Sequence, residues 1–200
     1  MREIHLFCED VGQERFVKAM LERFAVEYGV ELRVTVWSAR GGVGRMINRL
    51  QSYVAELEKV GGHVHIPDLI VVARDANCQG MAKTKKEVEG ILGRYIDFTV
   101  LAVPNPHVER WHLVDSSAFS QVLGTGCSAP DEKCEKERYK KLLVDAVLKA
   151  GVTPLIGGLE HTEDLVKAID LDRMTTADES LGAFISELRQ RFRAWSRQEK

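Results

Sequence analysis

The chain has 200 residues, of which 44% are hydrophobic and 29% charged, and its formal net charge is −2 at pH 7. A chain of this length and composition can bury a core without disulfide staples, and no run approaches the roughly 18 apolar residues of a membrane span. The near-neutral charge gives no global basic field, although a metal site can make a nuclease acidic overall. The first apolar run is short and broken by His5, unlike a signal peptide, so the cytoplasm is the expected location.

Apolar runs alternate with amphipathic stretches over the first 119 residues. Strands are expected over 3–9, 30–37, 68–75 and 97–106. Helices are expected between and after them, over 12–29, 44–62, 82–95 and 107–119. Leu6 should face one side of the first strand and Phe7 the other, and residues 30–37 alternate as a half-buried strand near a sheet edge does. The pattern predicts an α/β fold with a mainly parallel four-stranded sheet and helices on both faces.

The alternation of strand and helix patterns ends at about Gly124. A polar loop over 124–137 leads into a helix at about 132–150, and two further helical stretches cover 161–169 and 179–200. Residues 1–123 are therefore expected to form the core. Residues 124–200 are expected to form a helical extension packed on it, in a single structural domain.

Four cysteines occur at positions 8, 78, 127 and 134. None belongs to a C-x-x-C pair, and the seven-residue gap between Cys127 and Cys134 is a poor zinc spacing. In a reducing compartment, thiols that take no part in the structure are expected.

Acidic side chains follow the first, third and fourth predicted strands. The first strand ends through Glu9 and Asp10, the third ends through Asp75 with Asn77 two residues on, and Glu109 lies in the helix after the fourth. Parallel strands place their carboxyl ends at one edge of the sheet, where ligands collect. Carboxylates crowded there repel each other unless a proton or a cation lies between them, and Mg²⁺ and Mn²⁺ prefer such oxygen ligands.

Structural roles for the same residues stay open. Asp75 or Asn77 can cap the turn between strand and helix, since Asx residues favour such turns. Asp10 can cap the helix that follows it. The joint pattern of acids after three strands favours a metal site more than any single residue does.

Two basic stretches are candidates for contact with a phosphate backbone. Lys83, Lys85 and Lys86 follow the Asp75 loop in "GMAKTKK", where cations oppose the dipole of the predicted helix start. Arg40 and Arg45 lie in the glycine-rich loop "SARGGVGRMIN", which is neither a Walker loop nor a dinucleotide-binding motif. A solvated helix start and a flexible turn are the alternatives.

The stretches "LFCEDVGQERFVKAMLERF", "DLIVVARDANCQG" and "PNPHVERWHLVD" resemble the Toprim fold over roughly residues 3–119. The likeness is to small stand-alone Toprim proteins related to the overcoming-lysogenization-defect nucleases and to relatives in phage-defence operons. It implies a Toprim-like three-layer core with Glu9 matching the family glutamate, Asp75 the first acid of D-x-D and Glu109 the acid of E-x-W. Asn77 replaces the second acid, and Gly12 stands three residues after Glu9, so the matching acid can be Glu9, Asp10 or Glu14.

The resemblance implies a metal-dependent nuclease of DNA or RNA that uses Mg²⁺ or Mn²⁺. Its metal ligands would come from Glu9, Asp10, Asp75, Asn77 and Glu109, and Glu9 and Asp75 would be catalytic. The position of the basic loops adds Lys83 as a third catalytic residue and Arg40, Arg45, Lys83, Lys85 and Lys86 as contacts to nucleic acid. Related systems pair such a nuclease with an ATPase, so a partner ATPase is expected by analogy, and a homodimer stays open. The alternatives are a non-catalytic effector or adaptor, which Asn77 favours, and a small-molecule phosphohydrolase.

Overall fold

The computed structural model describes residues 1–38, 41–59, 66–128, 131–135 and 137–198. Within them, four strands form one sheet in the order β2-β1-β3-β4, and each pair of neighbours is parallel. The strands are β1 (Arg2–Cys8), β2 (Leu32–Ser38), β3 (Leu69–Ala73) and β4 (Thr99–Ala102). The predicted four-stranded parallel sheet is confirmed, including the edge position of residues 30–37, and the first and third strands are neighbours at its centre.

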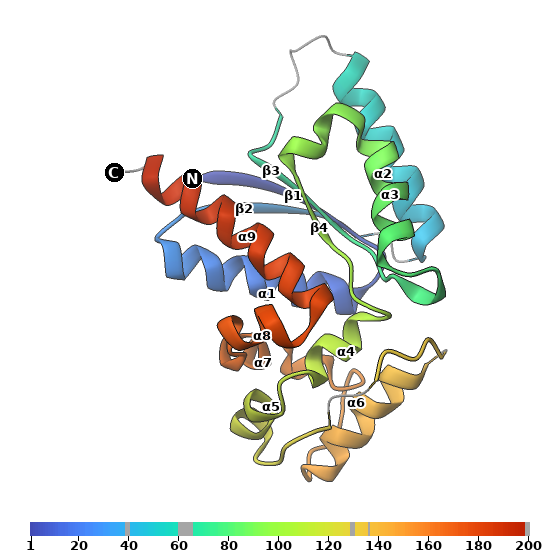
Figure 1. The fold of residues 1–200 in the computed structure, drawn as a ribbon, viewed down its shortest axis with the longest axis vertical. Helices are drawn as coiled ribbons and strands as arrows, with labels where there is room; N and C mark the ends of the chain where they lie inside the picture. The colour runs from blue at the N-terminus through green and yellow to red at the C-terminus, as the bar shows by residue number, and fades with distance from the viewer. Residues whose placement is uncertain (39–40, 60–65, 129–130, 136, 199–200) are drawn as a thin grey trace.

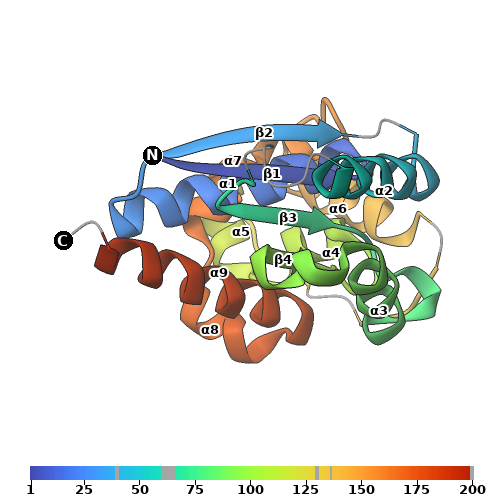
Figure 2. The ribbon, with the colours of Figure 1, turned by 90° about the horizontal axis from the view of Figure 1, so that it is seen from above.

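Helices cover both faces of the sheet (Figures 1 and 2). One face packs against α1 (Val11–Tyr28) and α9 (Glu179–Gln198), and the other against α2 (Val43–Lys59) and α3 (Met81–Leu92). Leu6 is buried on the first face and the adjacent Phe7 on the second, as the alternation in the sequence predicts. This α/β arrangement is consistent with the expected Toprim-like three-layer fold.

The remaining elements are short. After β4 the chain forms α4 (Val108–Leu113), α5 (Ser116–Leu123), α6 (Arg138–Lys149), α7 (Thr162–Ala168) and α8 (Leu171–Ala177). Short 3₁₀ segments occur at η1 (Asn77–Gln79), η2 (Gly93–Phe98) and η3 (Leu159–His161). The helices α5, α6 and α7 share a small apolar cluster with the end of α4, whereas α9 contributes to the main core beside α1.

Several predicted boundaries differ from those observed. The predicted strand 97–106 is reduced to Thr99–Ala102, because η2 takes up its first residues and Pro104 cannot donate to a ladder. The predicted helix 82–95 ends at Leu92, where Gly93 adopts a φ of 52°. The helix expected from about residue 132 begins at Arg138, and residues 60–62 of the predicted second helix lie outside the described residues.

The predicted helix over 107–119 is two helices, with the break at Asp115. The carboxylate of Asp115 accepts hydrogen bonds from the backbone N–H groups of Ser117 and Ala118, both at 3.0 Å, and so caps α5. It also forms an ion pair with Arg173 and accepts from the N–H of Asp170. Because an Asp side chain at a helix start satisfies donors that the helix leaves free, the chain restarts there.

A buried ion pair joins α4 to the start of α9. Asp178 pairs with Arg110, and the same carboxylate accepts hydrogen bonds from the hydroxyl of Ser180 and the N–H of Leu181, both at 2.7 Å. Asp178→Ala removes these contacts and takes one carboxylate partner away from the buried guanidinium of Arg110. We expect it to lower the free energy of unfolding by roughly 3–5 kcal/mol in chemical denaturation.

The matched control for this pair is Asp172→Ala, which removes an exposed partner of Arg189. Exposed pairs contribute at most about 1 kcal/mol, so the control should unfold like the wild type. Equal stability of Asp178→Ala and Asp172→Ala would show that the Arg110–Asp178 pair adds nothing to the fold.

The prediction of four uninvolved thiols is wrong. A disulfide links Cys78 in η1 to Cys134, across a sequence separation of 56 residues, and only Cys8 and Cys127 are free. Sequence spacing cannot reveal such a pair, because folding brings η1 and the segment before α6 together.

Candidate active site

A cavity of about 250 Å³ lies at the carboxyl ends of the central strands. All the residues that the sequence nominated as metal ligands line it, although they come from three separate loops or helices. The lining consists of Glu9, Asp10, Asp75, Asn77, His107, Glu109, Glu137, Tyr139 and Lys140. The structure therefore gathers the strand-end acids in one place, as the parallel sheet requires.

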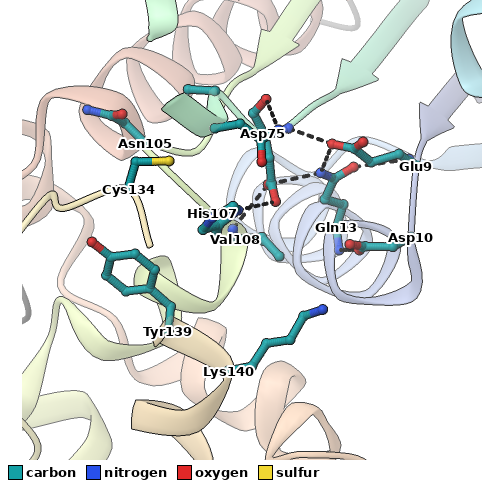
Figure 3. A network of polar contacts seen from close by, with 12 residues as sticks. Glu9, Asp10, Gln13, Asp75, Asn105, His107, Val108, Cys134, Tyr139 and Lys140 are labelled. Atoms are coloured by element: carbon teal, nitrogen blue, oxygen red, sulfur yellow. Dashed lines mark hydrogen bonds and ion pairs between the residues drawn. The ribbon is translucent and has the colours of Figure 1, made fainter. Parts of the chain in front are cut away.

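Glu9 and Asp75 are joined through Gln13 (Figure 3). The side-chain nitrogen Nε2 of Gln13 donates to Glu9 Oε1 at 2.8 Å and to Asp75 Oδ1 at 3.0 Å. Glu9 Oε1 also accepts from the backbone N–H of Asp75 at 2.8 Å. The two carboxylates thus share one donor, and the loops after β1 and β3 are held in contact by it.

Asp75 also anchors the start of α4. Its Oδ1 accepts from the backbone N–H of Val108 at 3.1 Å, and its Oδ2 lies 3.1 Å from Nδ1 of His107. The expected alternative was a cap for the turn that follows β3. Instead, Asp75 satisfies the amino end of the helix that follows β4, while η1 has no side-chain cap. A structural role and a place in the cavity therefore coincide at this residue.

Burial sets the charge state of the acids. Glu9, Asp75 and Glu109 are 9%, 7% and 5% exposed. Loss of hydration raises the pKa of all three carboxyl groups, and repulsion from Asp75 adds to this for Glu9 and Glu109. The pKa of Glu109 rises to about 7. Hydrogen bonds from His107 and Gln13 oppose the rise for Asp75, but all three acids hold a proton more readily than hydrated carboxyl groups do.

Asp10 contributes to the cavity and to the local fold. Its carboxylate Oδ1 accepts from the backbone N–H of Gln13 at 2.9 Å and so caps α1, which was the structural alternative for this residue. Asn77 donates its side-chain amide to the backbone oxygen of Asp75 at 3.2 Å. This hydrogen bond uses the side-chain nitrogen of Asn77 and does not involve its amide oxygen.

The sequence did not predict that α6 lines one side of the acidic cavity. Tyr139 and Lys140 come from α6, whose sequence carries no catalytic motif, and Glu137 directly precedes this helix. Figure 3 shows the Lys140 side chain reaching toward the acids. Burial alone would lower the pKa of Lys140, but the carboxylates of Glu109 and Glu137 outweigh burial, so the pKa of Lys140 is raised. Nothing in the local sequence distinguishes this lysine from its neighbours; only the packing of α6 on α4 brings it here.

The predicted basic contacts lie elsewhere. Arg40 is outside the described residues, and Arg45, Lys83 and Lys86 are exposed. Lys85 is half-buried and lies near Glu187 of α9. Burial raises the pKa of the Glu187 carboxyl group, and the positive charge of Lys85 partly opposes that rise. None of the four described residues lines the cavity, so the lysine that faces the acids is Lys140 and not Lys83.

The donor set is suited to a hard divalent cation. Carboxylate and amide oxygens are the ligands that Mg²⁺ and Mn²⁺ prefer, and a bound cation would offset the burial and the mutual repulsion that raise the pKa values of these three acids. In the described part of the chain, however, no three His, Cys, Asp or Glu side chains converge on one point as metal ligands do. The amide of Gln13 lies between Glu9 and Asp75 instead.

Comparisons with protein-family models, curated proteins and solved structures find no match to this chain. None of the helices in the described residues is both long and apolar enough to cross a membrane. The functional argument therefore depends on the cavity and its chemistry.

Proposed function

We propose that the chain is a divalent-metal-dependent hydrolase of phosphodiester bonds in nucleic acid, with its active site in the acidic cavity. The observation that carries this proposal is the gathering of Glu9, Asp75 and Glu109, all buried, at the carboxyl ends of parallel strands. Burial of three acids together costs free energy unless their charge is compensated. The likeness to Toprim nucleases over residues 3–119 supports the same reading by analogy.

Glu9, Asp75 and Glu109 would hold the cation, with Asp10 and Asn77 completing the oxygen donors of the cavity. A bound Mg²⁺ or Mn²⁺ would polarise a phosphoryl oxygen and lower the pKa of an attached water. In the described structure, Glu9 Oε1 and Asp75 Oδ1 already accept hydrogen bonds from Gln13, so cation binding has to use other oxygens or displace that amide.

Two side chains of the cavity can act on the substrate directly. Lys140 carries a positive charge opposite the acids and can offset the negative charge of a phosphodiester as the bond breaks. The hydrogen bond to Asp75 raises the pKa of His107, which makes it the cavity residue suited to give a proton to the leaving oxygen. Asp75 thus orients His107 as well as contributing charge.

The proposal is tested by incubating purified protein with supercoiled plasmid, single-stranded DNA and RNA in Mg²⁺, in Mn²⁺ or in chelator. Cleavage is expected with either metal and should stop when the metal is removed. An Asp75→Asn protein prepared in parallel guards against a contaminating nuclease. Cleavage that continues unchanged in chelator, or that survives in Asp75→Asn, would contradict the proposal.

Lys140 and the Lys83 cluster, which consists of Lys83, Lys85 and Lys86, should affect different kinetic parameters. Lys140→Met removes the cation that faces the acids, and we expect turnover to fall about a hundredfold with little change in KM. Neutralising Lys83, Lys85 and Lys86 together should raise KM and flatten its salt dependence, because these lysines lie outside the cavity, where they would contact the phosphate backbone away from the reacting bond. Steady-state kinetics at several salt concentrations separates the two effects. If the Lys83 cluster variant loses more turnover than Lys140→Met does, the catalytic lysine belongs to that cluster, as the sequence predicts for Lys83.

One observation favours a second candidate, a non-catalytic effector or adaptor that partners an ATPase. The Gln13 amide bridges Glu9 and Asp75 in the position where a cation would relieve their repulsion. A cavity stabilised in this way needs no metal to fold. If the protein shows neither cleavage nor a thermal shift with Mg²⁺ or Mn²⁺, this candidate replaces the nuclease.

A further inference from the structure

The disulfide between Cys78 and Cys134 lies at the rim of the acidic cavity. Cys78 directly follows Asn77, which lines the cavity, and Cys134 precedes the helix that carries Tyr139 and Lys140. Their Cα atoms are 5.3 Å apart, within the range of native disulfides. Figure 3 draws Cys134 in the same close view as the cavity residues His107 and Tyr139. The bond therefore joins two walls of one site that are far apart in sequence.

The residues 131–135, here called the rim segment, are otherwise held by a few polar contacts. The Tyr139 hydroxyl lies 2.6 Å and 2.7 Å from the backbone oxygens of Asp131 and Lys133. Glu132 accepts from the side-chain amide of Asn105 at 2.8 Å and lies 3.4 Å from Arg110. Glu132 is exposed, so its two contacts compete with water, and the disulfide is the covalent restraint on the segment.

The other end of the bond restrains the turn that carries Asn77. This residue has a positive φ of 47°, a conformation that is uncommon outside glycine and that Asn tolerates better than most residues. Its neighbour Cys78 is exposed, and so the disulfide can be reached by a small thiol. Rupture of the bond would release this turn and the rim segment together.

The remaining two cysteines differ from this pair. Burial raises the pKa of Cys8 to about 12 and that of Cys127 to about 11, so little reactive thiolate forms at either position near neutral pH. Thiol chemistry on this chain is thus concentrated at positions 78 and 134.

We propose that Cys78 and Cys134 are a reversible redox modification site that sets the order of the acidic cavity's rim. One thiol of a dithiol reductant attacks one cysteine sulfur, which breaks the S–S bond and releases the other cysteine as a thiol. The reductant's second thiol then attacks its own sulfur in the mixed disulfide and releases the first cysteine as a thiol. Two electrons and two protons pass to the cysteines while the reductant becomes a disulfide. The structural part of the proposal is independent of catalysis, and only its effect on metal binding rests on the proposed function.

The first measurement counts thiols in denaturant with a chromogenic disulfide reagent. Two thiols per chain are expected after mild oxidation by diamide and four after reduction by dithiothreitol, because one disulfide accounts for two of the four cysteines. Four free thiols after oxidation would overturn the assignment of the pair.

The second measurement is amide hydrogen exchange by mass spectrometry on the oxidised and reduced proteins. Peptides covering 77–80 and 131–135 should exchange about tenfold faster on reduction, while the buried strand β3 should not change. Mn²⁺ affinity, measured by titration, should fall about threefold in the reduced protein. If neither form binds Mn²⁺, the proposed function fails, whereas the exchange result still decides the redox site.

Variants assign the response to the pair. Cys78→Ser/Cys134→Ser should exchange like the reduced wild type without any reductant, and Cys8→Ala/Cys127→Ala should keep the full response. Should the first variant fail to fold, the reduced wild type supplies the same comparison. Equal exchange at the cavity rim in the oxidised and reduced wild type would overturn the proposal.

Discussion

Asp75→Asn should reduce metal-dependent phosphodiester cleavage on the order of a thousandfold while the fold stays intact. The substitution removes one of the buried charges that would hold a cation, and it weakens the hydrogen bond that orients His107. The fold should survive, because an amide oxygen can still accept from Gln13 and from the N–H of Val108, which now donate to Asp75 Oδ1. Turnover with Mg²⁺, together with circular dichroism, measures both parts of this expectation.

Thermal shift separates metal binding from catalysis at the same position. Without metal, Asp75→Asn should melt at or above the wild-type temperature, since it relieves repulsion with Glu9 and Glu109. With Mg²⁺ or Mn²⁺, the wild type should gain stability by mass action and the variant should gain less. Asp97→Asn is the matched control, because Asp97 is exposed and lies before β4, at the opposite end of that strand from the cavity. An identical metal response in the wild type and in Asp75→Asn would make Asp75 a structural anchor for α4 and nothing more.

The sequence carried enough information to predict the sheet and the position of the acids. Alternating apolar runs predicted the parallel strands, and the opposite faces of Leu6 and Phe7 followed from the two-residue repeat of a strand. Once β1 and β3 are parallel neighbours, Glu9 and Asp75 must emerge at the same edge. These features depend on local patterns and on one topological rule.

The other half of the cavity depends on contacts that no local pattern encodes. Lys140 and Tyr139 line the cavity only because α6 packs on α4 through residues such as Leu143. Cys134 meets Cys78 across 56 residues for the same reason. Gln13 falls within the predicted first helix, but its bridging role requires the loop after β3 to be beside it. Propensity and periodicity give the elements, and tertiary packing decides which side chains meet.

One local error has a local cause. The stretch around Asp115 continues the helical spacing of apolar residues, so periodicity alone predicts a single helix over 107–119. The competing signal is "VDSS", in which an Asp can accept from the following backbone N–H groups and begin a new helix. Capping preference outweighed periodicity at this position, and the break turns α5 away from α4.

Glu109→Gln should make the metal-free protein more stable at pH 8 and should flatten the dependence of its stability on pH. The pKa of Glu109 is raised from 4.5 to about 7 in the folded protein. A carboxyl group with a raised folded-state pKa favours folding fully below pH 4.5, and this contribution is lost as the pH rises through 7. The free energy of unfolding should therefore fall by up to about 3 kcal/mol over this window because of Glu109 alone.

Other groups titrate in the same range, so the comparison between variant and wild type matters more than either curve. Glu9 and Asp75 have pKa values raised in the same direction. His112 acts oppositely, because burial lowers its pKa to about 4 and its contribution to stability is lost as the pH falls below about 6.5. Urea denaturation of wild type and Glu109→Gln at pH 5, 6, 7 and 8, with chelator present, cancels these shared effects. Glu58→Gln, at an exposed position on α2, is the control and should follow the wild type.

Metal should reverse the same pH dependence if the cavity holds a cation. A bound Mg²⁺ or Mn²⁺ competes with protons for Glu109, so the stabilisation that it gives the wild type should increase from pH 5 to pH 8. In Glu109→Gln that increase should be smaller, because one of the competing protons is gone. If the two proteins instead show parallel pH curves in chelator, Glu109 ionises as a hydrated carboxylate does, and neither burial nor repulsion from Asp75 acts on it in this cavity.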